Sequence, residues 1–147
     1  MASPFSSKTR HIVWFALLAG GLLALIGVRF ILVPESAART FGLARARQGY
    51  ELHAIIGLRD LWLAGLAIAF ALLGEWRALA LWLGLGAVVC FADALIVALS
   101  SGRAHAIAFH VGSGVFCAAL ALASWRAAGR AIAKDLAKRG PGSEDAS

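Results

Sequence analysis

Residues 50–73 read YELHAIIGLRDLWLAGLAIAFALL, a stretch that is apolar over most of its length. A transmembrane helix needs about 20 predominantly apolar residues to cross about 30 Å of hydrocarbon. The stretch is long enough, yet it contains His53, Arg59 and Asp60. A charge in hydrocarbon is costly, so such residues persist where they face a bundle interior, find a partner or serve a function. The stretch therefore predicts a transmembrane helix with a polar inner face.

Three further stretches have the same character, at residues 12–33, 78–99 and 104–125. The chain of 147 residues is 61% hydrophobic and 15% charged, with a mean hydropathy of +0.79. A soluble domain, in contrast, is about half apolar and about a quarter charged. We therefore predict an all-α fold, a four-transmembrane-helix bundle. Because the connections after residues 73 and 99 are short, the second, third and fourth helices are expected to be antiparallel neighbours.

The chain divides into a central membrane domain and two ends. We predict an N-terminal tail at residues 1–11, the transmembrane domain at residues 12–125, and a basic helical extension with a disordered tail at residues 126–147. The first apolar stretch is longer than the 7–15 residues of a typical signal-peptide core, so we expect it to be an uncleaved span. Residues 35–49 suit either a short helix on the membrane surface or a solvated loop.

Basic residues in the connections predict the orientation, because cytoplasmic loops carry an excess of Lys and Arg. Four spans place both termini on one side of the membrane. That side holds Lys8, Arg10, Arg77, Arg126, Arg130, Lys134, Lys138 and Arg139, and the other side holds Arg39, Arg45, Arg47 and Arg103. We therefore expect a multi-pass protein of the cell membrane with both termini in the cytoplasm. The basic residues after position 125 recur at helical spacing, which favours contact with anionic lipid.

Six ionisable residues lie within the predicted helices, and all six fall in the same half of the bilayer. They are Arg29, His53, Arg59, Asp60, Asp93 and His110. At 1.5 Å per residue, they lie about 5–15 Å below the surface that meets the first and third connections. The other half of the predicted bundle contains no ionisable residue. This grouping predicts a polar pocket in one leaflet. The alternative is a buried ion-pair network that only fixes the order of the helices.

Helical periodicity indicates which face of each helix points inward, because residues three, four and seven apart share a face. The last three predicted helices each have one face of polar and small residues. These faces are Tyr50, His53, Gly57, Asp60, Ala64, Ala67 and Ala71; Gly86, Cys90, Asp93, Val97 and Ser100; and Arg103, Ala106, His110, Ser113, Cys117 and Ser124. Arg59 and the adjacent Asp60 point about 100° apart. We therefore expect Arg59 to pair with Asp93, or Arg29 with Asp60.

The sequence GLRDLWLAG at residues 57–65 resembles a family of small four-helix membrane proteins from bacteria and fungi, catalogued as domain of unknown function 4267. The sequences DALIV at residues 93–97 and AFH at residues 108–110 are similar to that family as well. The resemblance covers roughly residues 10–125, and the Gly-x-Arg-Asp pattern is its most specific part. It implies four transmembrane helices, the same polar positions and a distant architectural similarity to DoxX-like membrane proteins. It implies no particular reaction.

Three classes of function are compatible with the polar residues. The first is a module that binds or moves a small molecule or a proton, as a homodimer because four helices are few for a transporter. The second is an intramembrane enzyme acting on a quinone or isoprenoid, in which Asp60 or Asp93 exchanges protons with a histidine. The third is a structural accessory subunit of a larger membrane complex.

Several other classes find no support in the sequence. Cys90 and Cys117 show neither CxxC nor Cys/His spacing, so we expect buried thiols and no metal site. The net charge of +6 comes largely from residues that flank apolar segments, which does not indicate a nucleic-acid partner. We expect no cofactor. The expected partners are the lipid bilayer and a small-molecule ligand.

Overall fold

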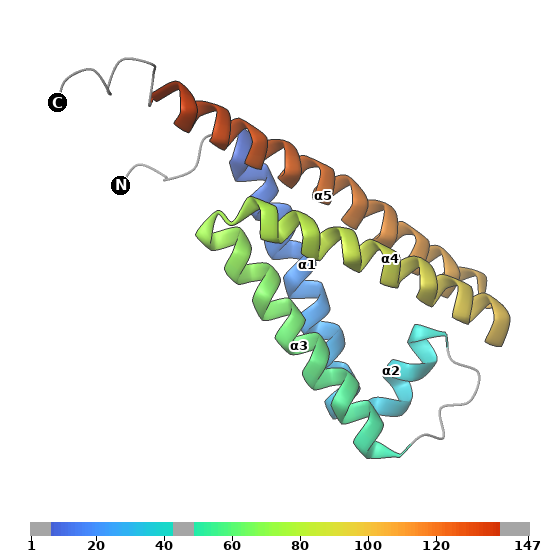
Figure 1. Ribbon diagram of the computed structural model, residues 1–147. Coiled ribbons are helices and arrows are strands. Elements are labelled where there is room, and N and C mark those ends of the chain that lie inside the picture. The colour runs from blue at the N-terminus through green and yellow to red at the C-terminus, as the bar shows by residue number, and fades with distance from the viewer. Residues whose placement is uncertain (1–6, 43–48, 139–147) are drawn as a thin grey trace, which may run out of the picture.

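The computed structural model describes residues 7–42 and 49–138, which contain five helices and no strand (Figure 1). The helices are α1 (Ser7–Leu32), α2 (Pro34–Phe41), α3 (Tyr50–Leu73), α4 (Trp76–Ser100) and α5 (Ala104–Lys138). All except α2 are long and apolar enough to cross a membrane. The predicted all-α fold with four spans and a helical C-terminal extension is therefore confirmed. The predicted ends at residues 1–6 and 139–147 lie outside the described residues, as do Arg45 and Arg47.

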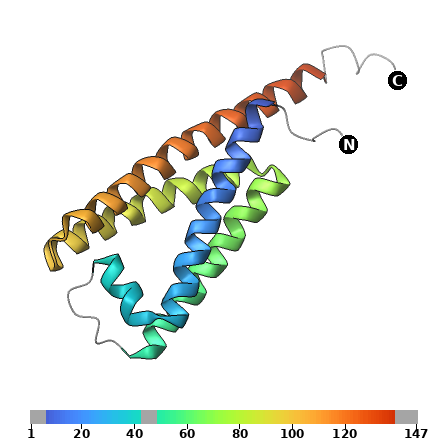
Figure 2. The ribbon, with the colours of Figure 1, turned by 180° about the vertical axis from the view of Figure 1, so that it is seen from behind.

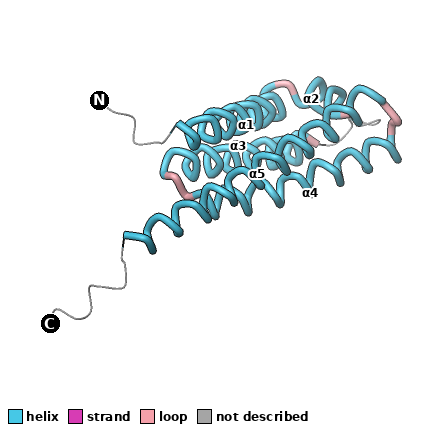
Figure 3. The backbone as a smooth tube through the Cα atoms, turned by 90° about the horizontal axis from the view of Figure 1, so that it is seen from above, coloured by secondary structure: helices cyan, strands magenta, loops and turns pink. Residues whose placement is uncertain are grey.

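The four long helices form two pairs that diverge from one end of the molecule (Figures 1 and 2). α1 packs along α3, and α4 packs along α5, as the view from above also shows (Figure 3). α3 and α4 contact each other mainly near the turn that joins them, which we call the joined end. The start of α1 and the end of α5 also lie at the joined end. The small helix α2 lies between the pairs at the opposite, open end.

A close backbone contact between Gly27 and Gly57 explains why α1 pairs with α3. A Cβ built on Gly27 would lie 2.7 Å from the carbonyl oxygen of Gly57, and one built on Gly57 would lie 2.6 Å from that of Gly27. Any larger side chain at either position would therefore force the two helices apart. Close approach of this kind is how small residues promote packing between membrane helices, because it increases the van der Waals contact between them.

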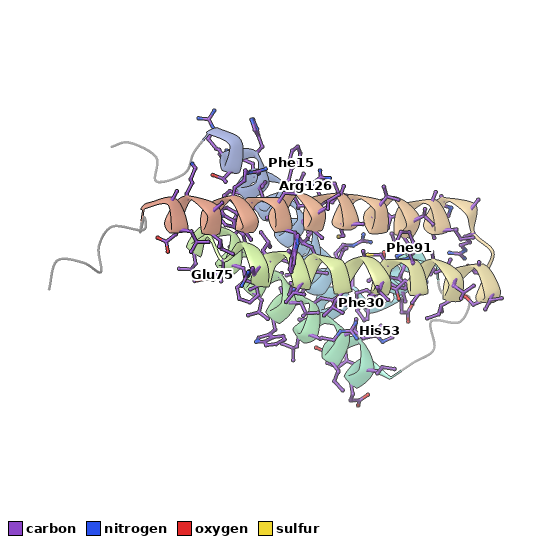
Figure 4. All side chains as sticks on the ribbon, turned by 45° about the horizontal axis from the view of Figure 1, so that its top comes forward. Phe15, Phe30, His53, Glu75, Phe91 and Arg126 are labelled. Carbon is purple, nitrogen blue, oxygen red and sulfur yellow. The ribbon has the colours of Figure 1, made fainter. Side chains whose placement is uncertain are left out.

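Apolar side chains from all four long helices meet at the joined end. This cluster consists of Ile12, Ala16, Ala71, Leu79, Leu83, Leu120 and Ala127. The ring of Phe15 meets that of Phe116 edge to face at the same end, with centroids 6.1 Å apart. Figure 4 labels Phe15 of α1 and Arg126 of α5 in the same half of the molecule as Glu75, which lies at the turn between α3 and α4. Since Ala127 belongs to the cluster, the C-terminal extension packs onto the bundle where it leaves the fourth span.

The first part of the connection after α1 forms a short helix, as one of the two expectations for residues 35–49 had it, whereas residues 43–48 lie outside the described residues. Pro34 occupies the first turn of α2, where a missing N–H costs no hydrogen bond. Gly42 ends the helix with a φ of 106°, a left-handed conformation that glycine adopts without strain. Ala37 and Ala38 are buried in a second apolar cluster with Phe30 of α1. The helix therefore packs into the open end of the bundle.

The contact between the glycines predicts a difference between two substitutions on α3. Gly57→Ala places a methyl group against the backbone of α1, and such overpacking costs about 1–3 kcal/mol. Gly65→Ala is the matched control, because a Cβ at that position meets nothing within 4 Å. We expect only Gly57→Ala to lower the midpoint of unfolding when purified protein in mixed micelles is titrated with dodecyl sulfate. Equal midpoints for the two variants would contradict the close contact.

Candidate functional site

Four of the six predicted site residues come together in one cluster, which we call the acid–base cluster: Arg59, Asp60, Asp93 and His110. Asp60 of α3 is buried, with 7% of its surface exposed. The charge of Asp93 on α4 also acts on Asp60, more weakly than the adjacent Arg59 does. Asp93 in turn interacts with Arg59 and with His110 of α5. Residues from both helix pairs therefore contribute to a single charged region.

The ion pair within the acid–base cluster differs from the one predicted. Nη2 of Arg59 lies 3.5 Å from Oδ1 of the adjacent Asp60, and the arginine side chain is 63% exposed. The prediction that these neighbours would not pair was wrong. The backbone directions of the two side chains do diverge, but a long arginine side chain can fold back to reach a short carboxylate. Asp93 interacts with Arg59 electrostatically, and in the described part of the chain it forms no ion pair.

Arg29 does not pair with Asp60, contrary to the second predicted pairing. Its Nη2 instead donates to Oγ1 of Thr40 at 3.2 Å and to Oγ of Ser36 at 3.5 Å. Both hydroxyl groups belong to α2, which begins two residues after the end of α1. A guanidinium group near a helix end can reach such nearby polar groups without moving deeper into the bundle. Arg29 therefore connects α1 to α2 by hydrogen bonds. It does not belong to the acid–base cluster.

The two histidines are linked by a chain of aromatic rings that runs through α2. The ring of His53 stacks against Phe30 with centroids 6.1 Å apart, and Figure 4 shows these two side chains close together. Phe30 meets Phe41 edge to face at 6.1 Å, and Phe41 meets His110 at 4.3 Å. Both histidines are 4% exposed. His53 is thus connected to His110 of the acid–base cluster by the rings of Phe30 and Phe41. Nδ1 of His53 forms a hydrogen bond with the carbonyl of Gly49 at 3.2 Å.

His110 also makes a hydrogen bond that connects α5 to α2. Its Nε2 lies 3.1 Å from the carbonyl oxygen of Phe41. Since a carbonyl only accepts, Nε2 carries the proton, and Nδ1 of the neutral ring is then a proton acceptor. At the adjacent Gly42, a Cβ would lie 2.7 Å from Cγ1 of Val97 and 2.9 Å from Cβ of Ala106. The end of α2 is therefore packed tightly between α4 and α5.

Burial confirms most of the predicted inner faces. On α3 the buried residues are His53, Gly57, Asp60, Ala64, Ala67 and Ala71, and from the predicted set only Tyr50 is exposed. On α4 the prediction was largely wrong, because only Val97 of the predicted face is buried and the buried residues are Leu79, Ala80, Leu83, Ala87, Ala94 and Val97. Packing against α5 decides this, since a Cβ on Gly114 would lie 2.9 Å from Cε1 of Phe91. Asp93 is only half-buried, and its charge interacts with His110 of α5 and with Arg59 of α3.

Sequence reasoning missed the contribution of α2 to this region. Phe41 and Gly42 connect the helix to α5, and Nη1 of Arg103 donates to the carbonyl of Arg39 at 2.9 Å. The sequence contained a signal for this helix. A proline is followed by alanines and a phenylalanine on one helix face, with Glu35 and Arg39 on the opposite face. Within the described residues, no group of His, Cys, Asp and Glu could hold a metal ion. Cys90 and Cys117 are free thiols.

The fold and its polar residues define the class of protein. Four long apolar helices make it a multi-pass membrane protein with charged residues between its spans. Residues 20–124 match the family described as Domain of unknown function (DUF4267), and the chain belongs to that family. No curated protein and no solved structure matches the chain. The distant similarity to DoxX-like proteins and the cytoplasmic position of the termini stay predictions.

The hydrogen bond from His110 predicts a local effect on α2. His110→Leu removes the donor to the carbonyl of Phe41, and loss of one such bond costs about 1 kcal/mol. We expect amide hydrogen exchange in α2 to become about fivefold faster, as measured by mass spectrometry. His105→Leu is the control, because His105 is an exposed residue of the same helix. Unchanged exchange in His110→Leu would show that other contacts hold α2 in place.

Proposed function

We propose that this protein is a membrane-embedded binding protein that takes up a small lipid-soluble cation at the acid–base cluster in exchange for a proton. The observation that carries the proposal is that two acids from different helix pairs belong to one charged region, which also contains Arg59 and His110. Asp60 and Asp93 interact electrostatically within apolar helices. Such intramembrane acids commonly mark the pathway of a substrate or a proton.

The charges of the acid–base cluster favour a cationic ligand. Asp60 has the guanidinium of Arg59 as its partner, whereas Asp93 forms no ion pair within the described residues. A carboxylate in low dielectric needs a counter-charge, or it becomes neutral by taking up a proton. The positive group of a ligand can provide that counter-charge. Binding of one monovalent cation then releases one proton, so the net charge of the site is conserved.

His110 supports the exchange of protons at this site. It interacts with Asp93, while its Nε2 stays bonded to the carbonyl of Phe41. The hydrogen bond fixes the ring orientation and leaves Nδ1 as the nitrogen that can accept a proton. Nδ1 can therefore receive the proton that Asp93 releases. In this role Asp93 binds the cation and His110 passes the proton on to water, so one proton leaves the site for each cation bound.

Tetraphenylphosphonium, a lipid-soluble monovalent cation, is a suitable probe for this proposal. We expect it to bind the purified full chain in nanodiscs, with affinity rising with pH because fewer carboxyl groups are then protonated. Asp93→Asn removes the charge that binds the cation, and Asp60→Asn leaves the guanidinium of Arg59 without its carboxylate partner near the bound cation. Each change is expected to weaken binding about 10- to 100-fold. Equilibrium dialysis measures the affinity, and a pH-sensitive dye reports the released proton.

Glu51→Gln is the matched control, because it neutralises an exposed acid in the first turn of α3. It is expected to bind the cation as tightly as the unmodified chain. If folded Asp60→Asn and Asp93→Asn bind as tightly too, the proposed function is wrong. If both substitutions prevent folding, the acids have the structural role of a buried ion-pair network.

A further inference from the structure

We infer that a second binding site, for the headgroup of an anionic phospholipid, lies on the outer face of α2 between Arg29 and Arg103. The two arginines come from opposite helix pairs and contact neighbouring residues of α2. Arg29 donates to Thr40, and Arg103 donates to the carbonyl of Arg39. The inference is independent of the function proposed for the acid–base cluster.

Both guanidinium groups are held in place without being neutralised. Their partners are hydroxyl and carbonyl oxygens, which carry no net charge. The contacts of Arg29 use Nη2 and that of Arg103 uses Nη1, whereas each guanidinium carries five N–H donors. Each arginine therefore retains donors for a further acceptor, and a phosphate oxygen matches the planar fork of these donors well.

A third arginine extends the positive surface. Arg39 lies on the exposed side of α2, and its Nη1 is 3.6 Å from Oε2 of Glu35. Their side chains are 59% and 76% exposed. Exposed ion pairs of this kind contribute little to stability, so Glu35 can release Arg39 when an anion approaches. Three arginines from α1, α2 and the start of α5 then face one headgroup.

The position along the membrane normal also suits a phospholipid. Arg29 lies three residues before the end of α1, about 5 Å from its last residue along the helix axis, so its guanidinium lies near the boundary with water. Leu25, Leu22 and Leu18 share the same side of α1 toward the membrane centre, and they are 57%, 51% and 53% exposed. An acyl chain can lie along these leucines while its phosphate contacts Arg29. A soluble phosphate ion has no acyl chain and therefore gains nothing from contact with these leucines.

Native mass spectrometry of the full chain in detergent can measure the affinity for each lipid. We expect phosphatidylglycerol to bind more tightly than phosphatidylcholine, because each arginine near the surface contributes a favourable interaction with anionic lipid. Arg103→Gln is expected to weaken phosphatidylglycerol binding roughly fivefold, and the double variant with Arg29→Gln roughly 25-fold. Equal binding of the two lipids by the unmodified chain would overturn the inference.

The control removes two exposed basic residues at the joined end, with Arg126→Gln and Arg130→Gln. This variant is expected to keep the preference for phosphatidylglycerol. Loss of the preference in the control, together with its survival in folded Arg103→Gln, would assign lipid binding to α5 and refute the α2 site. Arg29 is half-buried, so Arg103→Gln alone provides the test if the double variant does not fold.

Inorganic phosphate serves as a competitor to distinguish the source of the anion. If the site binds a phospholipid, millimolar phosphate leaves phosphatidylglycerol binding unchanged, because phosphate lacks the contact with the leucines of α1. Displacement of the lipid at equal concentrations of phosphate would show a site for a soluble anion and overturn the assignment to lipid.

Discussion

The contact between Gly27 and Gly57 is the constraint on which the arrangement of helices depends. A Cβ on either glycine would lie 2.6–2.7 Å from the backbone oxygen of the other, so α1 and α3 are too close at this point for any side chain. This contact pairs α3 with α1, and α4 packs along α5 instead. The two pairs then diverge from their common turn, with room for α2 at the open end. Asp60 lies three residues after Gly57 on the same face, so the contact also fixes the position of the acid.

The helix α2 determines how the open end is held together. It is too short to cross a membrane, yet it packs against α1 and α3, bonds to His110 of α5, and ends at Gly42 beside Val97 of α4. The hydrogen bond between His110 and the carbonyl of Phe41 joins it to α5, and Arg29 joins it to α1. Both contacts use a side chain that would be costly to leave without a partner in a membrane. Several ionisable residues of the open half therefore have a structural role, and Asp93 remains as the acid without an ion pair in the described chain.

The sequence was sufficient to predict the parts of the structure that depend on local periodicity. Asp60 and Gly57 were placed on one inner face of α3 because residues three apart share a helix side, and burial confirms this. The partner of α3 could not be predicted in this way, because pairing depends on which glycines from distant segments meet. The sequence placed Gly57 on the inner face of α3, but periodicity within α3 does not reveal that this glycine meets Gly27 of α1. The pairing of Arg59 depended on how a flexible side chain bends, which helical geometry does not specify.

Polar groups are concentrated toward the open end of the bundle, and this limits how an ion could move through the protein. The acid–base cluster lies toward the open end, while the joined end is filled by apolar side chains from all four long helices, including the fully buried Leu79 and Leu83. An ion moving along the bundle would lose its polar partners on entering the apolar region at the joined end, at a cost of several kcal/mol. A continuous path for charge through one copy of the bundle is therefore disfavoured. Exchange of a cation for a proton at one end avoids this barrier, because both species enter and leave on the same side.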